Sequence, residues 1–176
     1  MEIFLAQVVA QLQVDATDVL LLHPNSEMLD YLAGRGFRTQ AHESARVPVG
    51  KSLAGRVAKD RRLLKIENLK DQSDDPFVSE LLANEGFVSY FGVPLITKGK
   101  VKGVLEVFHR AAMHPYAEWL DFLNTLAGQA AIAIENAALF ANLEQSNQEL
   151  SQAYDATIEG WSRALDLRDK ETEGHT

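Results

Sequence analysis

Apolar and polar residues alternate in short blocks over the first part of the chain, which is typical of several small elements around one core. Residues 3–13 carry apolar side chains at helical spacing and predict a helix. The apolar run at 19–23 and the segment at 28–37 are separated by turn residues, so we expect two strands of an antiparallel hairpin. A short helix with Ser52 as its N-cap and a short strand at 63–66 are predicted next.

The strongest strand patterns belong to residues 87–97 and 101–109, which flank a Lys-Gly-Lys turn and predict a long hairpin. Asp75 followed by Pro76 predicts the start of another helix, with the acid as N-cap and proline at the first helical position. Helices inserted between paired strands indicate an α+β fold. We expect an antiparallel sheet of about five or six strands with flanking helices.

After Pro115 the apolar spacing stays helical and meets no further proline. About 40 helical residues would span about 60 Å, so we predict a long C-terminal helix whose distal half projects beyond the core. Its apolar residues recur at steps of three, four or seven, which predicts a parallel homodimer through this helix. The alternative is a solvated helix held by its neighbours. The predicted dimer residues are Leu139, Leu143, Leu150, Tyr154, Ile158 and Trp161.

Composition excludes several classes of function. The net charge of −8, with no run of Lys and Arg, argues against nucleic acid as a partner. The absence of cysteine excludes a disulfide framework, a cysteine-bound zinc and a thiol nucleophile, and it fits a cytoplasmic protein. The N-terminus lacks the pattern of a signal peptide, and no apolar run approaches the roughly 20 residues of a membrane helix.

Four passages together resemble one known family. They are Asp-Ala-Thr-Asp-Val-Leu-Leu-Leu-His-Pro at 15–24, Val-Gly-Lys-Ser-Leu-Ala-Gly-Arg-Val-Ala at 49–58, Phe-Val-Ser-Tyr-Phe-Gly-Val-Pro-Leu-Ile at 87–96 and Lys-Gly-Val-Leu-Glu-Val-Phe at 102–108. In this order and spacing they resemble a GAF domain, over residues of about 3 to 142. A PAS domain, which has a similar sheet and signalling helix, is the alternative fold, and the Val-Pro-Leu hairpin favours GAF.

The resemblance implies a small-molecule site between the sheet and a cap of helices and loops, here residues 52–87, and signalling through flanking helices. Because side chains alternate across a strand, Ser89 and Tyr90 cannot both face such a pocket. Aromatic side chains in this stretch are also typical of a plain core, so a dimerisation scaffold without ligand is the alternative function. The candidate ligand-binding residues are Ile66, Asn68, Phe77, Leu81, Phe87, Ser89, Tyr90 and Phe91.

Three ligands or activities of GAF-type domains do not fit the chain. Most of the residue pattern of the cyclic-nucleotide-binding members is missing around His109 and Arg110. Covalent bilin attachment and methionine sulfoxide reduction both need cysteine, which the chain lacks. The identity of a small-molecule ligand is therefore left open, and no cofactor is expected in this chain.

The last residues, about 154 to 176, resemble the opening of an HD-GYP phosphohydrolase domain. Tyr-Asp-Ala-Thr-Ile-Glu-Gly-Trp-Ser-Arg-Ala-Leu-Asp-Leu-Arg-Asp and a final Gly-His-Thr carry this resemblance. It implies that His175 matches the first metal-binding histidine and that Glu171 matches a carboxylate ligand of some members. The other ligands for iron or manganese are not among these residues, so we expect an empty site and no catalysis by this chain.

Together these patterns predict three parts: a GAF domain at 1–142, a coiled-coil-like linker at 143–155 and the start of an HD-GYP domain at 156–176. The predicted function is a regulatory, small-molecule-sensing and dimerising module of a bacterial signal-transduction protein. The resemblance implies that the output domain, which we expect beyond these residues, is a cyclic di-GMP phosphodiesterase.

Overall fold

The structure is a computed structural model that describes residues 1–40, 46–72, 78 and 83–173, without the side chains of Gln72 and 164–173. It comprises two compact units, Met1–Glu135 and Asn136–Thr176, which are described separately here. The predicted helix start at Asp75 lies outside the described residues.

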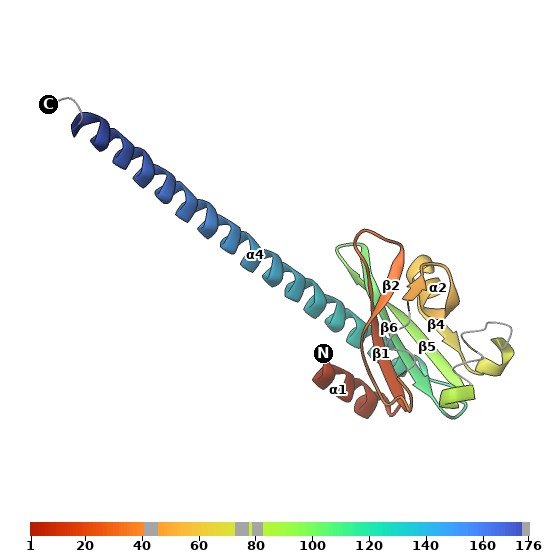
Figure 1. The fold of residues 1–176 in the computed structure, drawn as a ribbon. Coiled ribbons are helices and arrows are strands. Elements are labelled where there is room, and N and C mark those ends of the chain that lie inside the picture. Colours follow the sequence, from red (N-terminus) through yellow and green to blue (C-terminus); the bar gives the residue numbers. More distant parts are fainter. Residues whose placement is uncertain (41–45, 73–77, 79–82, 174–176) are drawn as a thin grey trace. The chain divides into compact units, whose positions relative to one another are not determined.

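A six-stranded antiparallel sheet forms the centre of the first unit, with the strands in the order β3-β2-β1-β6-β5-β4 (Figure 1). This confirms the predicted fold class. The two longest strands, β5 and β6, pair along their full length. The strands are β1 (Ala16–Leu22), β2 (Met28–Arg35), β3 (Arg46–Pro48), β4 (Leu64–Ile66), β5 (Ser89–Thr97) and β6 (Lys100–His109).

Both hairpins predicted from the sequence are present, β1–β2 and β5–β6. The β5–β6 turn consists of Lys98 and Gly99, which have φ of 48° and 73°. Positive φ at both central residues is the conformation that matches the twist of the two strands, and glycine adopts it without steric cost.

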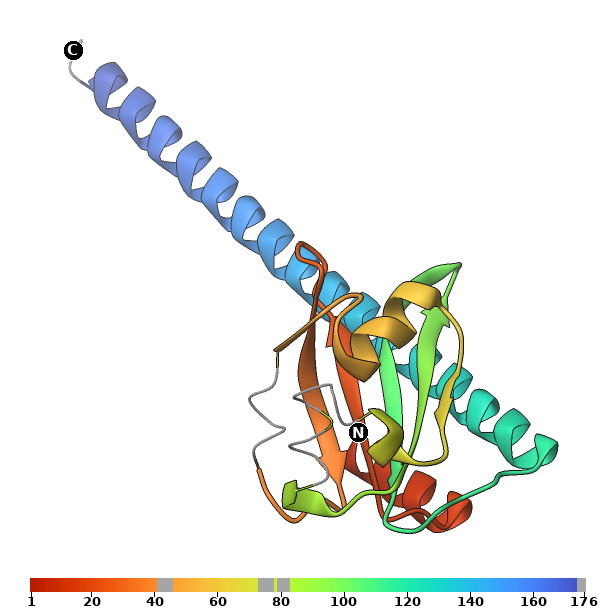
Figure 2. The same ribbon diagram turned by 90° about the vertical axis from the view of Figure 1, so that its right-hand side faces the viewer.

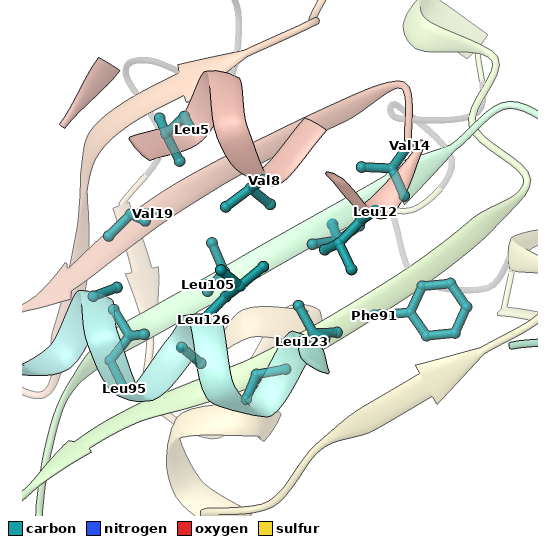
Figure 3. Close-up of a cluster of buried hydrophobic side chains, with 14 of the residues drawn as sticks. Leu5, Val8, Leu12, Val14, Val19, Phe91, Leu95, Leu105, Leu123 and Leu126 are labelled. Atoms are coloured by element: carbon teal, nitrogen blue, oxygen red, sulfur yellow. The ribbon is translucent and has the colours of Figure 1, made fainter. Parts of the chain in front are cut away.

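One face of the sheet is covered by α1 (Glu2–Leu12) and by the beginning of α4 (Ala117–Glu173) (Figures 2 and 3). Leucine and valine residues at helical spacing on α1 pack against the side chains that β1, β5 and β6 present on this face of the sheet. The Trp119 indole nitrogen donates a hydrogen bond of 3.2 Å to the Leu12 carbonyl and so joins the two helices. The cluster includes Leu5, Val8, Leu12, Val19, Phe91, Val93, Leu105, Val107, Trp119, Leu123 and Leu126.

The opposite face carries α2 (Ser52–Asp60) and η2 (Leu69–Gln72). Gly55 lets α2 approach β3, because a Cβ at this position would collide with the Pro48 carbonyl oxygen. The prediction that Ser52 caps this helix is wrong. Ser52 is the first helical residue, and the N-cap position is Lys51, which makes no side-chain capping bond.

The second unit is helical, since α4 continues through it to Glu173. The predicted long C-terminal helix is thus confirmed, at 57 residues for the whole of α4. Every side chain from 136 to 163 is exposed, including large apolar ones. None of the helices in the described parts of the chain combines the length and apolar character needed to cross a membrane.

Candidate functional site

The predicted ligand-binding residues on β5 fall on both faces of the sheet. Tyr90 packs on the α2 face, whereas Phe91 lies on the α1 face with its ring 5.0 Å from that of Trp119. The Ser89 hydroxyl lies within hydrogen-bond distance of the carbonyls of Glu67 (2.7 Å) and Ala111 (3.1 Å), and its single proton can be donated to either. Phe91 and Tyr90 therefore cannot line one pocket, and Ser89 is engaged with backbone.

Aromatic rings fill the part of the α2 face where a pocket wall is predicted. Phe87 and Tyr90 are fully buried. The Phe108 ring stacks on Phe87 at 4.9 Å and meets Tyr90 edge-on at 5.4 Å. Phe37 closes the cluster at 5.7 Å from Phe87. The structure thus places Phe87 and Tyr90, two of the predicted ligand-binding residues, in the hydrophobic core, where they pack against neighbouring aromatic rings.

Two other predicted residues, Ile66 and Asn68, lie beside an open groove at the β4 edge of the sheet. Its volume is about 590 Å³. Phe77 and Leu81 lie outside the described residues, so their relation to this groove is not described. The groove is lined by Lys65, Ile66, Glu67, Asn68, Lys70, Asp71, Val88, Ala112 and His114.

Charged groups within the groove pair with one another. The Glu67 carboxylate lies 2.6 Å from Lys65 Nζ and 2.6 Å from His114 Nδ1. Its pKa is lowered, first by the Lys65 hydrogen bond and then by His114. Asn68 accepts a hydrogen bond of 3.2 Å from the Lys70 amide through its side-chain oxygen. The groove therefore offers fixed donors and acceptors of both charge signs to a small polar ligand.

A second polar feature, not predicted from the sequence, crosses the centre of the sheet on the α2 face. Asp18 on β1 is directly opposite Glu106 on β6. Gly34 is the partner of Asp18 on the outer side, and Gly92 is the partner of Glu106. These four residues form one line across four strands, which we name the acidic row. The two acids are 4% and 2% exposed.

The two glycines of the acidic row leave space that tyrosine hydroxyls occupy. A Cβ at Gly92 would collide with the Tyr90 hydroxyl and would lie 2.7 Å from Val57 Cγ2 of α2. A Cβ at Gly34 would lie 2.9 Å from the Tyr31 hydroxyl and 3.1 Å from Asp18 Cβ. Each acid therefore has a tyrosine hydroxyl on its outer side, and Val57 covers one end of the row.

One carboxyl oxygen of each acid in the row lacks a hydrogen-bond partner among the described residues. Among the described residues, Asp18 Oδ1, Glu106 Oε1 and the Tyr90 hydroxyl are buried and have no partner of standard geometry. Burial, and next the Glu106 charge, raise the pKa of Asp18 well above its usual range. Burial likewise raises the pKa of Glu106 to about 7, although Tyr90 and Asp18 stabilise its ionised form. The Tyr90 hydroxyl thus lies close to the Glu106 carboxyl group, but the two groups lack the alignment of a hydrogen bond.

A charged network closes the end of the sheet beside the aromatic cluster. The Glu85 carboxylate, 2% exposed, accepts hydrogen bonds from the amides of Arg38 and Thr39, both at 2.8 Å, and from Arg110 Nη2 at 3.2 Å. Arg110 also stacks on Phe87, with its guanidinium carbon 4.6 Å from the ring centre. Burial alone would raise the pKa of Glu85, but these hydrogen bonds outweigh it and lower the pKa.

The sequence carried a signal for the acidic row. Glu106 interrupts a run of strand-forming apolar residues, and Asp18 stands directly before another. Strand alternation puts Glu106 on the same face as Val104 and Phe108, which are both buried. An acid at an inward-facing position of a central strand is rare enough to mark a feature that needs an explanation.

The predicted dimer residues on α4 are all exposed in the single chain, by 50% to 73%. They are Leu139, Leu143, Leu150, Tyr154, Ile158 and Trp161. Glu171 lies within α4, but its side chain is not described, and His175 lies outside the described residues. Elsewhere in the described part of the chain, no group of three His, Asp or Glu side chains could hold a metal ion.

A curled antiparallel sheet with helices on both faces and a long C-terminal helix defines a class of regulatory signalling domain. The family model described as "GAF domain" matches residues 1–135, and the chain belongs to this family. No curated protein matches the sequence.

Solved structures of other GAF domains are similar in fold. The GAF domain of an Acinetobacter phosphoenolpyruvate-protein phosphotransferase is 23% identical with a TM-score of 0.67, over 80% of this chain and 82% of that one. The corresponding domain from Coxiella burnetii is 20% identical with a TM-score of 0.66, over 78% and 82%. The second GAF domain of DevS from Mycobacterium smegmatis is 22% identical with a TM-score of 0.63, over 80% and 94%.

Proposed function

We propose that this chain is the regulatory part of a bacterial signal-transduction protein. A small molecule bound by the GAF domain acts through helix α4 on an output domain. GAF domains are signalling and sensor modules, and similar domains belong to phosphotransferases and to DevS. The groove at the β4 edge is the observation that supports binding, because it combines a volume of about 590 Å³ with fixed polar groups.

A binding screen tests the sensing role. Thermal unfolding of the chain is followed with individual nucleotides, amino acids and carboxylates added, and hits are measured by calorimetry. A ligand at 100 times its Kd adds about 2.7 kcal/mol of stability. Asn68→Ala should weaken binding at the groove, whereas Asn25→Ala, in the exposed β1–β2 turn, should leave it unchanged. Equal binding by both variants would exclude the groove.

The aromatic cluster favours a second candidate function, a dimerisation scaffold that needs no ligand. Phe37, Phe87, Phe108 and Tyr90 pack together where a pocket is predicted, which leaves the stability of this face independent of an added molecule. In that case the screen yields no compound that raises the unfolding temperature, and the chain is still a dimer.

Dimerisation through α4 is part of both functions. The apolar residues named above are at least half exposed in the single chain and recur at coiled-coil-like steps, so a second copy would bury them. Sedimentation of the Leu143→Asp and Leu150→Asp variants should show monomers, whereas Gln148→Asp should stay dimeric. Truncation after Asn142 should also abolish the dimer. A monomeric unmodified chain would contradict this proposal.

We infer the output domain from the resemblance of residues 154–176 to an HD-GYP domain. Glu171 and His175 would then be two of the ligands for iron or manganese in a cyclic di-GMP phosphodiesterase. The chain itself should not hydrolyse cyclic di-GMP with either metal, and turnover would contradict its assignment as a regulatory part. A His-Asp pair encoded soon after codon 176 is the expected sign of the output domain, and any other continuation would refute it.

A further inference from the structure

The acidic row contains two carboxyl groups with no basic partner. Asp18 and Glu106 face each other on adjacent central strands, where opposite side chains have Cβ atoms about 5 Å apart. No ion pair joins either acid to Lys, Arg or His within the described part of the chain. Two buried charges of the same sign at this distance repel strongly, so a positive species must accompany at least one of them.

The packing around the row restricts what that species can be. Val57 of α2 lies over Gly92, and Leu53 and Ala54 are buried beside it. The groove of about 590 Å³ lies at the β4 edge, and none of its lining residues belongs to the row. A metal ion or an ammonium group needs room for its own radius and for further ligands, whereas a proton needs none.

The hydrogen-bond geometry also favours a proton. Within the part of the chain that the structure describes, Asp18 Oδ1 and Glu106 Oε1 have no N–H or O–H donor at hydrogen-bond geometry. A carboxyl group that carries a proton becomes a donor, so a proton on one acid can satisfy an oxygen of the other. Such a proton would supply a donor to these two oxygens, which have no hydrogen-bond partner among the described residues.

We propose that the acidic row binds a proton between Asp18 and Glu106, and that this proton is a second input to the domain that controls how tightly α2 packs on the sheet. With this proton bound, the row carries one negative charge, shared by the two acids, on the face that α2 covers. Without it, the row places two uncompensated charges under an apolar helix, which then packs less tightly.

The groups that face the row fit this role. From β5 the Tyr90 hydroxyl, and from β2 the Tyr31 hydroxyl, lie on either side of the pair. From α2, the charge of Arg56, which is exposed, acts on Tyr90. Burial gives Glu106 a pKa of about 7 against an ordinary 4.5. The folded row thus binds its proton more tightly than the unfolded chain does.

The experiment compares thermal unfolding from about pH 5 to about pH 8 for three chains. The unmodified chain should lose stability as the pH rises, because the folded state holds a proton that the unfolded state has released. The double variant Asp18→Asn with Glu106→Gln should lose this slope. The control Glu135→Gln, an acid outside the row whose pKa is lowered, should keep it. Equal slopes for the unmodified chain and the double variant would overturn the proposal.

Three further measurements keep the test decisive if the double variant does not fold. Infrared spectra of the unmodified chain at about pH 6 should contain the band of a protonated carboxyl group, and its absence would overturn the proposal. Added magnesium, calcium or potassium should not restore stability at about pH 8. Restoration by one of them would mean that the row binds that cation instead. Amide protection in α2 should fall with the same pH midpoint, and an unchanged α2 would remove the link to packing.

Discussion

Replacement of Glu85 by glutamine perturbs the network that closes the end of the sheet. The carboxylate accepts bonds from two backbone amides, the Thr39 hydroxyl (2.7 Å) and Arg110. A glutamine amide has one acceptor oxygen, and its NH₂ group would face donors. At least two of these charge-assisted bonds are therefore lost at a site that is 2% exposed.

The magnitude follows from the number of bonds. A hydrogen bond to a charged group contributes about 1.5 kcal/mol, so the loss of two costs about 3 kcal/mol. For a domain of this size, that lowers the melting temperature by about 10 °C. Because the pKa of Glu85 is lowered, its contribution is present at neutral pH and is lost as the pH falls below the ordinary value of 4.5.

Circular dichroism during heating measures the effect, with Glu27→Gln as the control. Glu27 is an exposed acid in the β1–β2 connection, so its replacement should change little. The difference between the Glu85 variant and the unmodified chain should be largest at pH 7 and should shrink at about pH 3. A loss at pH 7 no larger than that of the control would refute the role assigned to this network.

Three more outcomes are expected. Gly92→Ala should lower the free energy of unfolding by about 1–3 kcal/mol, because the new Cβ would collide with the Tyr90 hydroxyl. Gly128→Ala, in open space on α4, should raise it by up to about 1 kcal/mol, and urea unfolding measures both changes. Trp119→Phe should cost about 1–3 kcal/mol through the unpaired Leu12 carbonyl, whereas Tyr116→Phe, at an exposed position, should leave the melting temperature of the domain unchanged. Stability should peak at about pH 5. The raised pKa values of Asp18 and of Glu106, the latter about 7, remove stability as the pH rises above this peak, and the lowered pKa of Glu85 removes it below 4.5; a pH series of melting temperatures tests the sign.

The sheet could be predicted from the sequence because its strongest signals are local. Alternation in 87–97 and 101–109 and the turn between them define the long hairpin without help from distant residues. The long helix is predictable for the same reason, since no proline follows Pro115. The prediction of a Ser52 cap failed because a serine before an apolar run is compatible with both a cap and a first helical residue.

The candidate site was less predictable, because it depends on which side chains from distant strands become neighbours. The sequence places Tyr90 and Phe91 next to each other, yet their contacts lie on opposite faces of the sheet. The acidic row combines residues from four strands, and only the pairing register brings them into line. Charge alone does not reveal it, since Asp18 and Glu106 are 2 of 25 acids in the chain.

The two glycines that flank the acids have a consequence for sequence change over evolution. A side chain at Gly92 is compatible with the fold only if Tyr90 becomes smaller or Val57 recedes, and Gly34 is tied to Tyr31 in the same way. Substitutions at these positions should therefore occur together rather than singly. A set of homologous sequences would then contain the tyrosines mainly where the glycines occur, and the pairs would covary as two separate couples on either side of the acids.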